Sequence, residues 1–277
     1  MSQHGDGSDE ADQAVVWTAR LAERPHVAEL VLDRPHAMGA ISTAVAQGIR
    51  RGCADLATDP DVRAVVLRSS AERAFCVGAD LKERIGFDDD AMRAQRAEFH
   101  VAFAAVRDLP VPVVAAVHGF ALGGGCELAL SCDVVVADTT AVFGLPEVQV
   151  GLVPGGGGTQ LLARRVGSGR AFEMILTGRR VPAEEAGRIG LAEHVVAEGH
   201  AADEALTVAS SIAANSPTAV RGARRAIRDG LDLPLQEGLD VEDRAWEEAA
   251  FSVDRPEGIA AFAEKRTPRW AAPGDQP

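Results

Sequence analysis

The chain has 277 residues, 47% of them hydrophobic, and is long enough to bury a substantial core in one large domain. Its 28 basic residues are outnumbered by 41 acidic ones, and the net charge of −13 argues against nucleic acid or an anionic membrane surface as a partner. No apolar run approaches the roughly 20 residues that span a bilayer. The sequence shows no export signal, and its four cysteines lack metal-ligand spacing. We therefore expect a cytoplasmic protein with reduced cysteines and without a metal site.

Strands and helices are expected to alternate over residues 14–198. Residues 1–13, with almost nothing apolar, are predicted to form a disordered tail. Short apolar runs rich in β-branched residues then recur, and several of the segments between them have helical spacing, which predicts buried strands joined by crossover helices in an α/β fold. These runs are residues 27–32, 64–67, 113–117 and 134–137.

Two of the connecting helices have clear limits. Apolar residues at intervals of four, four and three behind Ser42 or Thr43 predict a capped helix that ends near Ala57. A second helix is expected over residues 88–108, because Pro110 prevents it from continuing further.

The pattern changes after about Gly199, where strands are no longer indicated. Three amphipathic helices are expected, at 202–214, 218–228 and 235–251, separated by prolines of which Pro256 is the last. Residues 199–277 are therefore predicted to form a C-terminal helical region.

Two glycine-bearing segments, 75–83 and 119–127, each follow an apolar run and lead into a helix. Backbone N–H groups at helix N-termini can hold a negative oxygen, and glycine lets the backbone approach closely. Together the segments indicate an oxyanion hole of the kind that a thioester carbonyl requires.

These segments and four further stretches resemble the enoyl-CoA hydratase/isomerase family, the crotonase superfamily, over residues 15–270. The further stretches are LDRPHAM at 32–38, FGLPE at 143–147, GLVPGGGGT at 151–159 and AFAEKR at 261–266. The resemblance implies a crotonase-like (ClpP/crotonase) spiral of ββα units over 14–198. It also implies that the C-terminal helices hold homotrimers, which pair into hexamers.

The resemblance, closest to the hydratases, implies a hydro-lyase that adds water to a 2-enoyl-CoA. The N–H groups of Ala79 and Gly124 would hold the thioester oxygen, Glu127 would activate water, and Glu147 would deliver a proton to the α-carbon. Without the resemblance, Glu127 could simply complement a helix dipole and Glu147 could be an ordinary surface glutamate. Because CoA arrives as part of the acyl-CoA substrate, no cofactor is implied.

Contacts to the CoA thioester are also implied by the resemblance, at His36, Ala37, Asp80, Leu81, Lys82, Gly155 and Lys265. The chain has only two lysines, Lys82 and Lys265, and both are expected near CoA phosphates, where an ammonium is a good point charge. Lys265 would reach across a subunit boundary.

Two positions depart from the family pattern. His118, where many members have asparagine, is expected to be a structural histidine. Gly39 stands where the family usually has an asparagine, and this puts in doubt the local order of the loop and the fit of the adenine end of CoA. The acyl pocket wall is expected from residues 85–103. Alternatives left open are an isomerase, another acyl-CoA enzyme of the superfamily, and a non-catalytic crotonase-like binding protein.

Overall fold

A six-stranded sheet is the larger of two sheets in the computed structural model, which describes residues 15–271. Its order is β1-β2-β3-β5-β7-β10, and every neighbouring pair is parallel except the antiparallel pair β1 and β2. The tail expected over residues 1–13 lies outside the described residues. The strands are β1 (Val16–Leu21), β2 (Arg24–Leu32), β3 (Ala64–Ser69), β5 (Val113–Val117), β7 (Val134–Asp138) and β10 (His194–Val196).

A second, four-stranded sheet has the order β4-β6-β8-β9. Strands β3, β5 and β7 of the larger sheet are each followed by a three-residue strand of the smaller one and then by helical structure. This repeated ββα path confirms the predicted spiral. The short strands are β4 (Ala74–Cys76), β6 (Phe120–Leu122), β8 (Val142–Gly144) and β9 (Arg180–Pro182).

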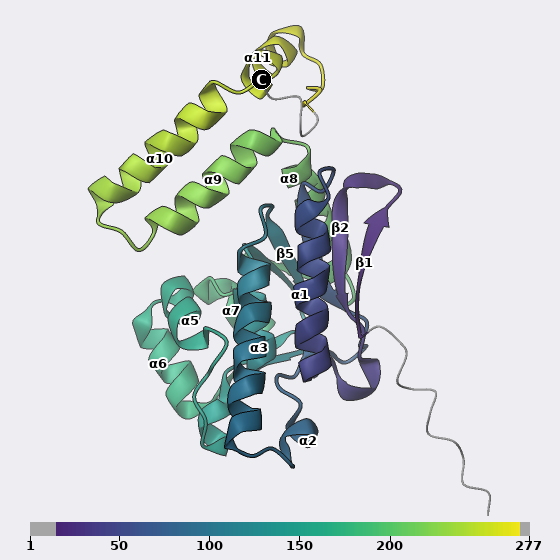
Figure 1. Ribbon diagram of the computed structural model, residues 1–277, viewed down its shortest axis with the longest axis vertical. Helices are drawn as coiled ribbons and strands as arrows, with labels where there is room; N and C mark the ends of the chain where they lie inside the picture. Colours follow the sequence, from purple (N-terminus) through teal and green to yellow (C-terminus); the bar gives the residue numbers. More distant parts are fainter. Residues whose placement is uncertain (1–14, 272–277) are drawn as a thin grey trace, which may run out of the picture.

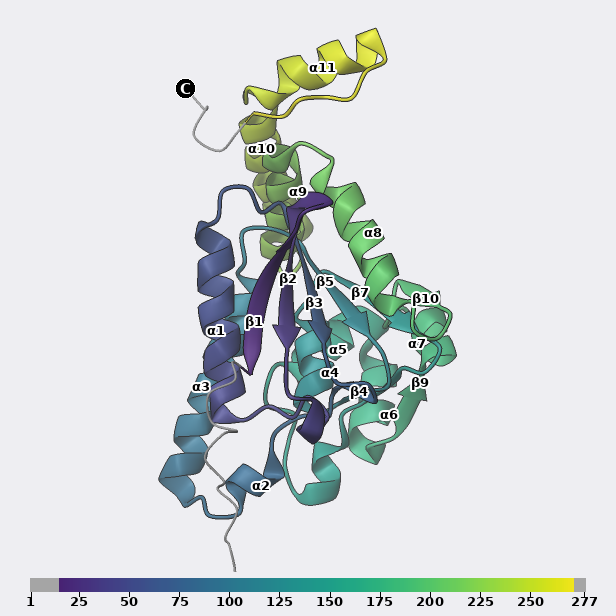
Figure 2. The ribbon, with the colours of Figure 1, turned by 90° about the vertical axis from the view of Figure 1, so that its right-hand side faces the viewer.

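Both faces of the larger sheet are covered. Helices α1 (Thr43–Thr58) and α3 (Asp89–Arg107) contact each other on one side, and α8 (Ala201–Ala213) lies on the other (Figure 2). In β3, Val65 and Leu67 belong to the main core, whereas Ala64 and Val66 pack with the alanines of α8. A parallel sheet buried on both faces explains the continuous apolar runs.

Side-chain caps begin both long helices, and the one on α1 was predicted. Ser42 Oγ accepts a hydrogen bond from Val45 N–H at 3.3 Å, and Asp88 accepts one from Ala91 N–H at 2.8 Å, so α1 and α3 begin where the sequence indicated. None of the helices within residues 15–271 is long and apolar enough to cross a membrane. The remaining short helices of the core are η1 (Pro35–Ala37), α2 (Leu81–Arg84), α4 (Gly124–Leu130), η2 (Pro146–Val150), α5 (Gly158–Val166), α6 (Ser168–Thr177) and α7 (Ala183–Ile189).

Helices α9 (Pro217–Gly230) and α10 (Leu235–Ala250) lie side by side and project from the core, followed by α11 (Asp254–Glu264) (Figure 1). Of the helices expected after residue 199, α8 packs on the sheet, so the projecting part starts at α9. Helix α11 was not predicted, because a proline such as Pro256 is typical of a break between helices. Pro256 lies in the first turn of α11, where a missing N–H costs no intrahelical hydrogen bond.

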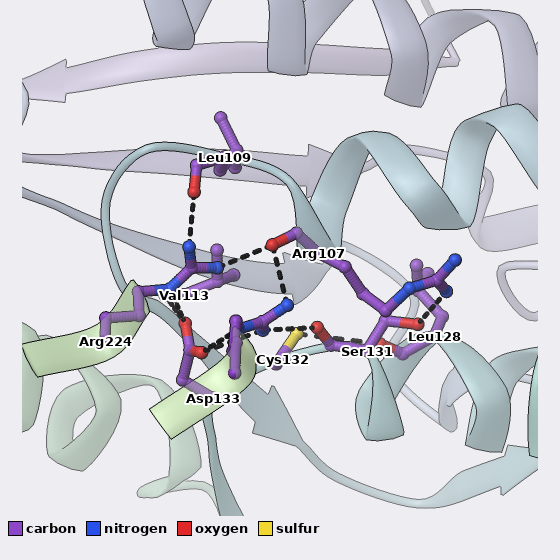
Figure 3. Close-up of polar contacts among 9 residues, drawn as sticks. Arg107, Leu109, Val113, Leu128, Ser131, Cys132, Asp133 and Arg224 are labelled. Carbon is purple, nitrogen blue, oxygen red and sulfur yellow. Dashed lines mark hydrogen bonds and ion pairs between the residues drawn. The ribbon is translucent and has the colours of Figure 1, made fainter. Parts of the chain in front are cut away.

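Asp133 anchors α9 to the core (Figure 3). Its carboxylate accepts hydrogen bonds from Arg224 Nε at 2.8 Å and from Arg228 Nη2 at 2.8 Å. The same arginines donate to the carbonyl oxygen of Arg107 at the end of α3, and Arg224 also donates to the carbonyl of Leu109. The projecting pair of helices is therefore fixed by a charged network as well as by apolar contacts.

Candidate active site

The two glycine segments meet at the N-terminus of α4. A Cβ on Gly125 would overlap the carbonyl oxygen of Cys76, and a Cβ on Gly78 would lie 3.2 Å from Gly124 N. Only glycine allows this approach, and Gly78 also has a φ of +94°. Within residues 15–271, neither Ala79 N–H nor Gly124 N–H donates to a protein acceptor. Two backbone donors are thus free for a ligand.

A cavity of about 380 Å³ opens beside these two N–H groups. It is lined by residues from α2, α3, α4, η2 and the loop before α5. Six of the residues predicted from the sequence line it, namely Ala79, Leu81, Gly124, Glu127, Glu147 and Gly155.

Glu127 lies on α4 and is only 3% exposed. Its Oε1 accepts hydrogen bonds from Gly156 N–H at 2.6 Å and from Gly158 N–H at 2.8 Å. A Cβ on Gly156 would overlap the ring of Phe103, so the glycine run lets the loop reach the carboxylate. Burial raises the pKa of Glu127, while the hydrogen bonds from Gly158 and Gly156 oppose that rise.

Glu147 follows Pro146 at the start of η2. Its Oε2 is buried and has no hydrogen-bond partner within the described part of the chain. Burial raises the pKa of Glu147 to about 7, and the negative charge of Glu127 acts in the same direction. A buried acceptor without a partner, facing a cavity, is typical of a functional group rather than a structural one.

The two carboxylates differ in their surroundings although they share one cavity. Glu127 is held by two backbone donors, whereas Glu147 is held by none at Oε2. Such a pair can divide proton transfers to and from one water molecule. Among residues 15–271, no three or more His, Cys, Asp and Glu side chains are grouped as a metal site.

Four predicted CoA-contact residues lie near the cavity without lining it, in η1 and at the start of α2. His36 and Lys82 are exposed, and Ala37 is partly exposed. Asp80 is buried, caps α2 and forms an ion pair with Arg34 at 2.7 Å. Burial works against its ionisation, but hydrogen bonds from Arg34 and α2 lower the pKa of Asp80 overall. Asp80 thus ties α2 to the segment before η1.

Lys265 is not brought to the cavity of its own chain. It is the exposed C-cap residue of α11, which lies at the opposite end of the molecule from α2 (Figure 1). A contact between Lys265 and CoA requires the cavity of a neighbouring copy.

The two departures from the family pattern have structural explanations. His118 Nε2 lies 2.6 Å from the carbonyl oxygen of Ala71, which agrees with the structural role expected for it. Gly39 has a φ of +67°, and a Cβ there would lie 2.6 Å from the carbonyl oxygen of Phe75. Glycine therefore fits a loop that lies close against β4.

Sequence reasoning missed three arginines that line the cavity, Arg84, Arg96 and Arg180. Of residues 85–103, from which the acyl pocket wall was expected, Met92, Arg96 and Phe99 of α3 line the cavity. Their spacing of four and three residues places them on one helix face. In the sequence, the only sign of a role for Arg96 is that it lies at this spacing between two apolar residues.

Comparison with known proteins agrees with this fold. A family model described as Enoyl-CoA hydratase/isomerase matches residues 23–273. YngF of Bacillus subtilis, which carries the name of that family, is 44% identical over 87% of this chain and 93% of its own length. The mitochondrial enoyl-CoA hydratase domain-containing protein 2 of Mus musculus is 40% identical over 88% of this chain and 84% of its own. The crystal structure of an enoyl-CoA hydratase from Bacillus anthracis has a TM-score of 0.90 and 40% identity, covering 92% of this chain and 98% of that one.

The chain belongs to the enoyl-CoA hydratase/isomerase family, a family of the crotonase superfamily whose members act on acyl-CoA thioesters. The resemblance and the fold class predicted from the sequence are thereby confirmed.

Proposed function

We propose that this protein is an enoyl-CoA hydratase, which adds water across the double bond of a 2-enoyl-CoA to give a 3-hydroxyacyl-CoA. One observation carries the proposal. The carboxylates of Glu127 and Glu147 line a single cavity together with the N–H groups of Ala79 and Gly124.

The free N–H groups of Ala79 and Gly124 hold the thioester oxygen and stabilise the negative charge that develops on it. Glu127 accepts a proton from water as the water oxygen attacks the β-carbon of the enoyl group. Glu147 delivers a proton to the α-carbon. One oxyanion donor contributes about 10²- to 10³-fold to such a rate, and a positioned acid or base contributes about 10²- to 10⁴-fold. This chemistry needs no cofactor, because CoA enters with the substrate.

In this proposal the CoA part lies along His36, Ala37, Asp80 and Leu81, with Lys82 near its phosphates, while Gly155 contacts the thioester end. Lys82 is exposed and can reach an anion outside the cavity. A cytoplasmic location belongs to the same proposal, and the four cysteines, all buried as free thiols, suit a reducing compartment.

We also propose that the protein forms homotrimers, alone or paired as hexamers. Helices α9 and α10 expose large apolar side chains around a groove of about 760 Å³. Leu231 is 67% exposed, Leu235 is 80% exposed and Trp246 is 65% exposed. An apolar patch of this kind marks a surface for protein association, and assembly would bring Lys265 to a neighbouring cavity.

The first test mixes the purified protein with crotonyl-CoA and follows the loss of the conjugated enoyl-thioester absorbance, with the product identified by mass. A gain of one water is expected. The variants Glu127→Gln and Glu147→Gln should each lose about 10²- to 10⁴-fold in kcat while binding of the CoA thioester stays within a few-fold.

The choice of substrate and the two glutamine variants together separate the alternative functions. A protein that leaves 2-enoyl-CoAs unhydrated but converts a 3-enoyl-CoA to the 2-enoyl isomer is an isomerase. Unchanged turnover in either glutamine variant removes that glutamate from the mechanism. Binding without turnover of any acyl-CoA would favour a non-catalytic binding protein.

A further inference from the structure

Three arginines line the cavity, although the chain as a whole has a net charge of −13. Arg84 of α2 and Arg96 of α3 both line it, alongside Met92 and Phe99. Arg180, from β9, lines it as well, with its guanidinium 5.5 Å from the centre of the Phe120 ring.

Arg96 lies within electrostatic range of Glu127 but is not paired with it. Within residues 15–271 its guanidinium makes no hydrogen bond and no ion pair, and its Nε lies 3.0 Å from where a Cβ of Gly155 would be. Arg93, one turn earlier on the same helix, pairs with Asp89 and Asp90 instead. The difference is that Arg93 is at the surface, whereas Arg96 faces the cavity.

Arg84 is fixed in place but also forms no ion pair within the described residues. Its Nε donates to Gln95 Oε1 at 2.7 Å, and its guanidinium lies 5.6 Å from the centre of the Phe99 ring. Burial lowers the pKa of Arg84, with repulsion by Arg96 contributing, and burial also lowers the pKa of Arg96. The charges of Glu83 and Glu127 oppose these shifts, but neither carboxylate forms an ion pair with either arginine. Two neighbouring guanidinium groups that no carboxylate contacts favour an anionic ligand.

The ligand must suit the place as well as the charge. Arg96 lies against Gly155 and within electrostatic range of Glu127, at the reacting end of the cavity. The residues expected at the CoA end, such as His36 and Lys82, lie outside the cavity lining. An anion at Arg96 is therefore more readily reached from the acyl chain than from the CoA phosphates.

Building on the proposed hydratase function, we propose that Arg84 and Arg96 bind a carboxylate at the far end of the acyl group. The preferred substrate is then a 2-enedioyl-CoA, a 2-enoyl thioester that ends in a carboxylate. The planar guanidinium fork matches a carboxylate in a bidentate geometry.

The test compares 2-pentenoyl-CoA with 2-pentenedioyl-CoA, which differ only by a terminal methyl or carboxylate group. The wild type should show a higher kcat/KM for the diacid thioester. Arg96→Gln should lower that kcat/KM by about 10- to 100-fold and leave the value for 2-pentenoyl-CoA within about threefold. Arg96→Lys should restore part of the loss, and Arg93→Gln, which removes the same charge from α3 outside the cavity, should change neither value.

A phosphate of CoA is the other possible source of the anion. N-acetylcysteamine thioesters of the same two acids carry no phosphate, so the preference for the diacid must persist with them. An equal loss for both CoA substrates in Arg96→Gln, or no preference in the wild type, overturns the proposal. If neither substrate is hydrated, the hydratase function has failed instead, and the preference is then read from equilibrium binding of glutaryl-CoA against pentanoyl-CoA.

Discussion

Glu127 and Glu147 show how two identical side chains acquire different chemistry in one cavity. Backbone N–H groups of Gly156 and Gly158 hold the carboxylate of Glu127 and oppose the effect of its burial. Glu147 lacks such donors at Oε2, and its pKa is raised to about 7. The pair therefore favours Glu147 as the carboxyl group that carries a proton near neutral pH, beside a Glu127 whose charged form two backbone donors stabilise.

This difference predicts the pH dependence of hydration. If Glu147 delivers the proton, kcat/KM for crotonyl-CoA should fall above about pH 7, by about tenfold for each further pH unit, because the protonated fraction of Glu147 falls. The measurement is a pH profile of kcat/KM, accompanied by the affinity for a saturated acyl-CoA at each pH. A profile that stays level up to pH 9 would contradict the role of Glu147 as the acid.

The stability of the fold supplies an independent control for the same group. The pKa of Glu147 is raised from 4.5 to about 7 by folding, so the folded state holds this proton more tightly than the unfolded state. The resulting stabilisation is complete below about pH 4.5 and is lost as pH rises through about 7, by up to about 3 kcal/mol. Glu147→Gln should lack this pH-dependent contribution in denaturant unfolding.

At the scale of the elements, long buried strands and capped helices could be predicted from the sequence. The runs that became β2, β3, β5 and β7 are apolar on both faces, and such runs carry a strong signal. The strands β4, β6, β8 and β9 have three residues each, too few to show a period of two.

The same limit applies to the site. Glu127 and Glu147 were singled out through the family resemblance, because their local patterns alone also suit a helix-dipole residue and a surface glutamate. Contacts between residues far apart in the chain could not be predicted. The hydrogen bond from Gly158 to Glu127 spans 31 residues, and Arg96 reaches the cavity only because α3 packs across it. A lone arginine in a helical pattern gives no indication of what it faces.

The docking of α9 depends on a network that is invisible in the sequence. Asp133 faces Arg224 and Arg228 from α9, and its side chain is only 19% exposed. The partners lie 91 and 95 residues away along the chain. Each arginine also bonds to a backbone carbonyl, so the charges are satisfied on more than one side.

Asp133→Asn should therefore destabilise the protein by about 2–4 kcal/mol, because two half-buried guanidinium groups lose their counter-charge. Denaturant unfolding measures the loss, and hydrogen exchange should show increased opening of residues 217–250. Asp229→Asn makes the same change at an exposed position on α9 and should stay within about 0.5 kcal/mol of the wild type. Equal effects of the two variants would mean that the network contributes nothing specific.

At the scale of the whole molecule, the projecting helices leave two features unexplained by a single chain. The apolar side chains of α9 and α10 are exposed, and α11, which ends at Lys265, lies at the end of the molecule away from α2. A trimer would account for both, because one interface would cover the apolar residues and place Lys265 near the CoA end of another cavity.

Light scattering after size exclusion should accordingly give three or six times the mass of one chain, and Leu231→Glu should reduce that mass.

The link between the oligomer and the site is tested by co-expressing the Glu127→Gln variant with the Lys265→Gln variant. Lys265→Gln alone should raise KM for crotonyl-CoA about five- to tenfold, because a charged contact to phosphate is lost. In mixed oligomers, some cavities combine an intact Glu127 from one copy with an intact Lys265 from its neighbour, so turnover with the wild-type KM should reappear. If Lys265 served its own cavity, co-expression would yield only the KM of the Lys265→Gln variant, since no cavity would then contain both residues.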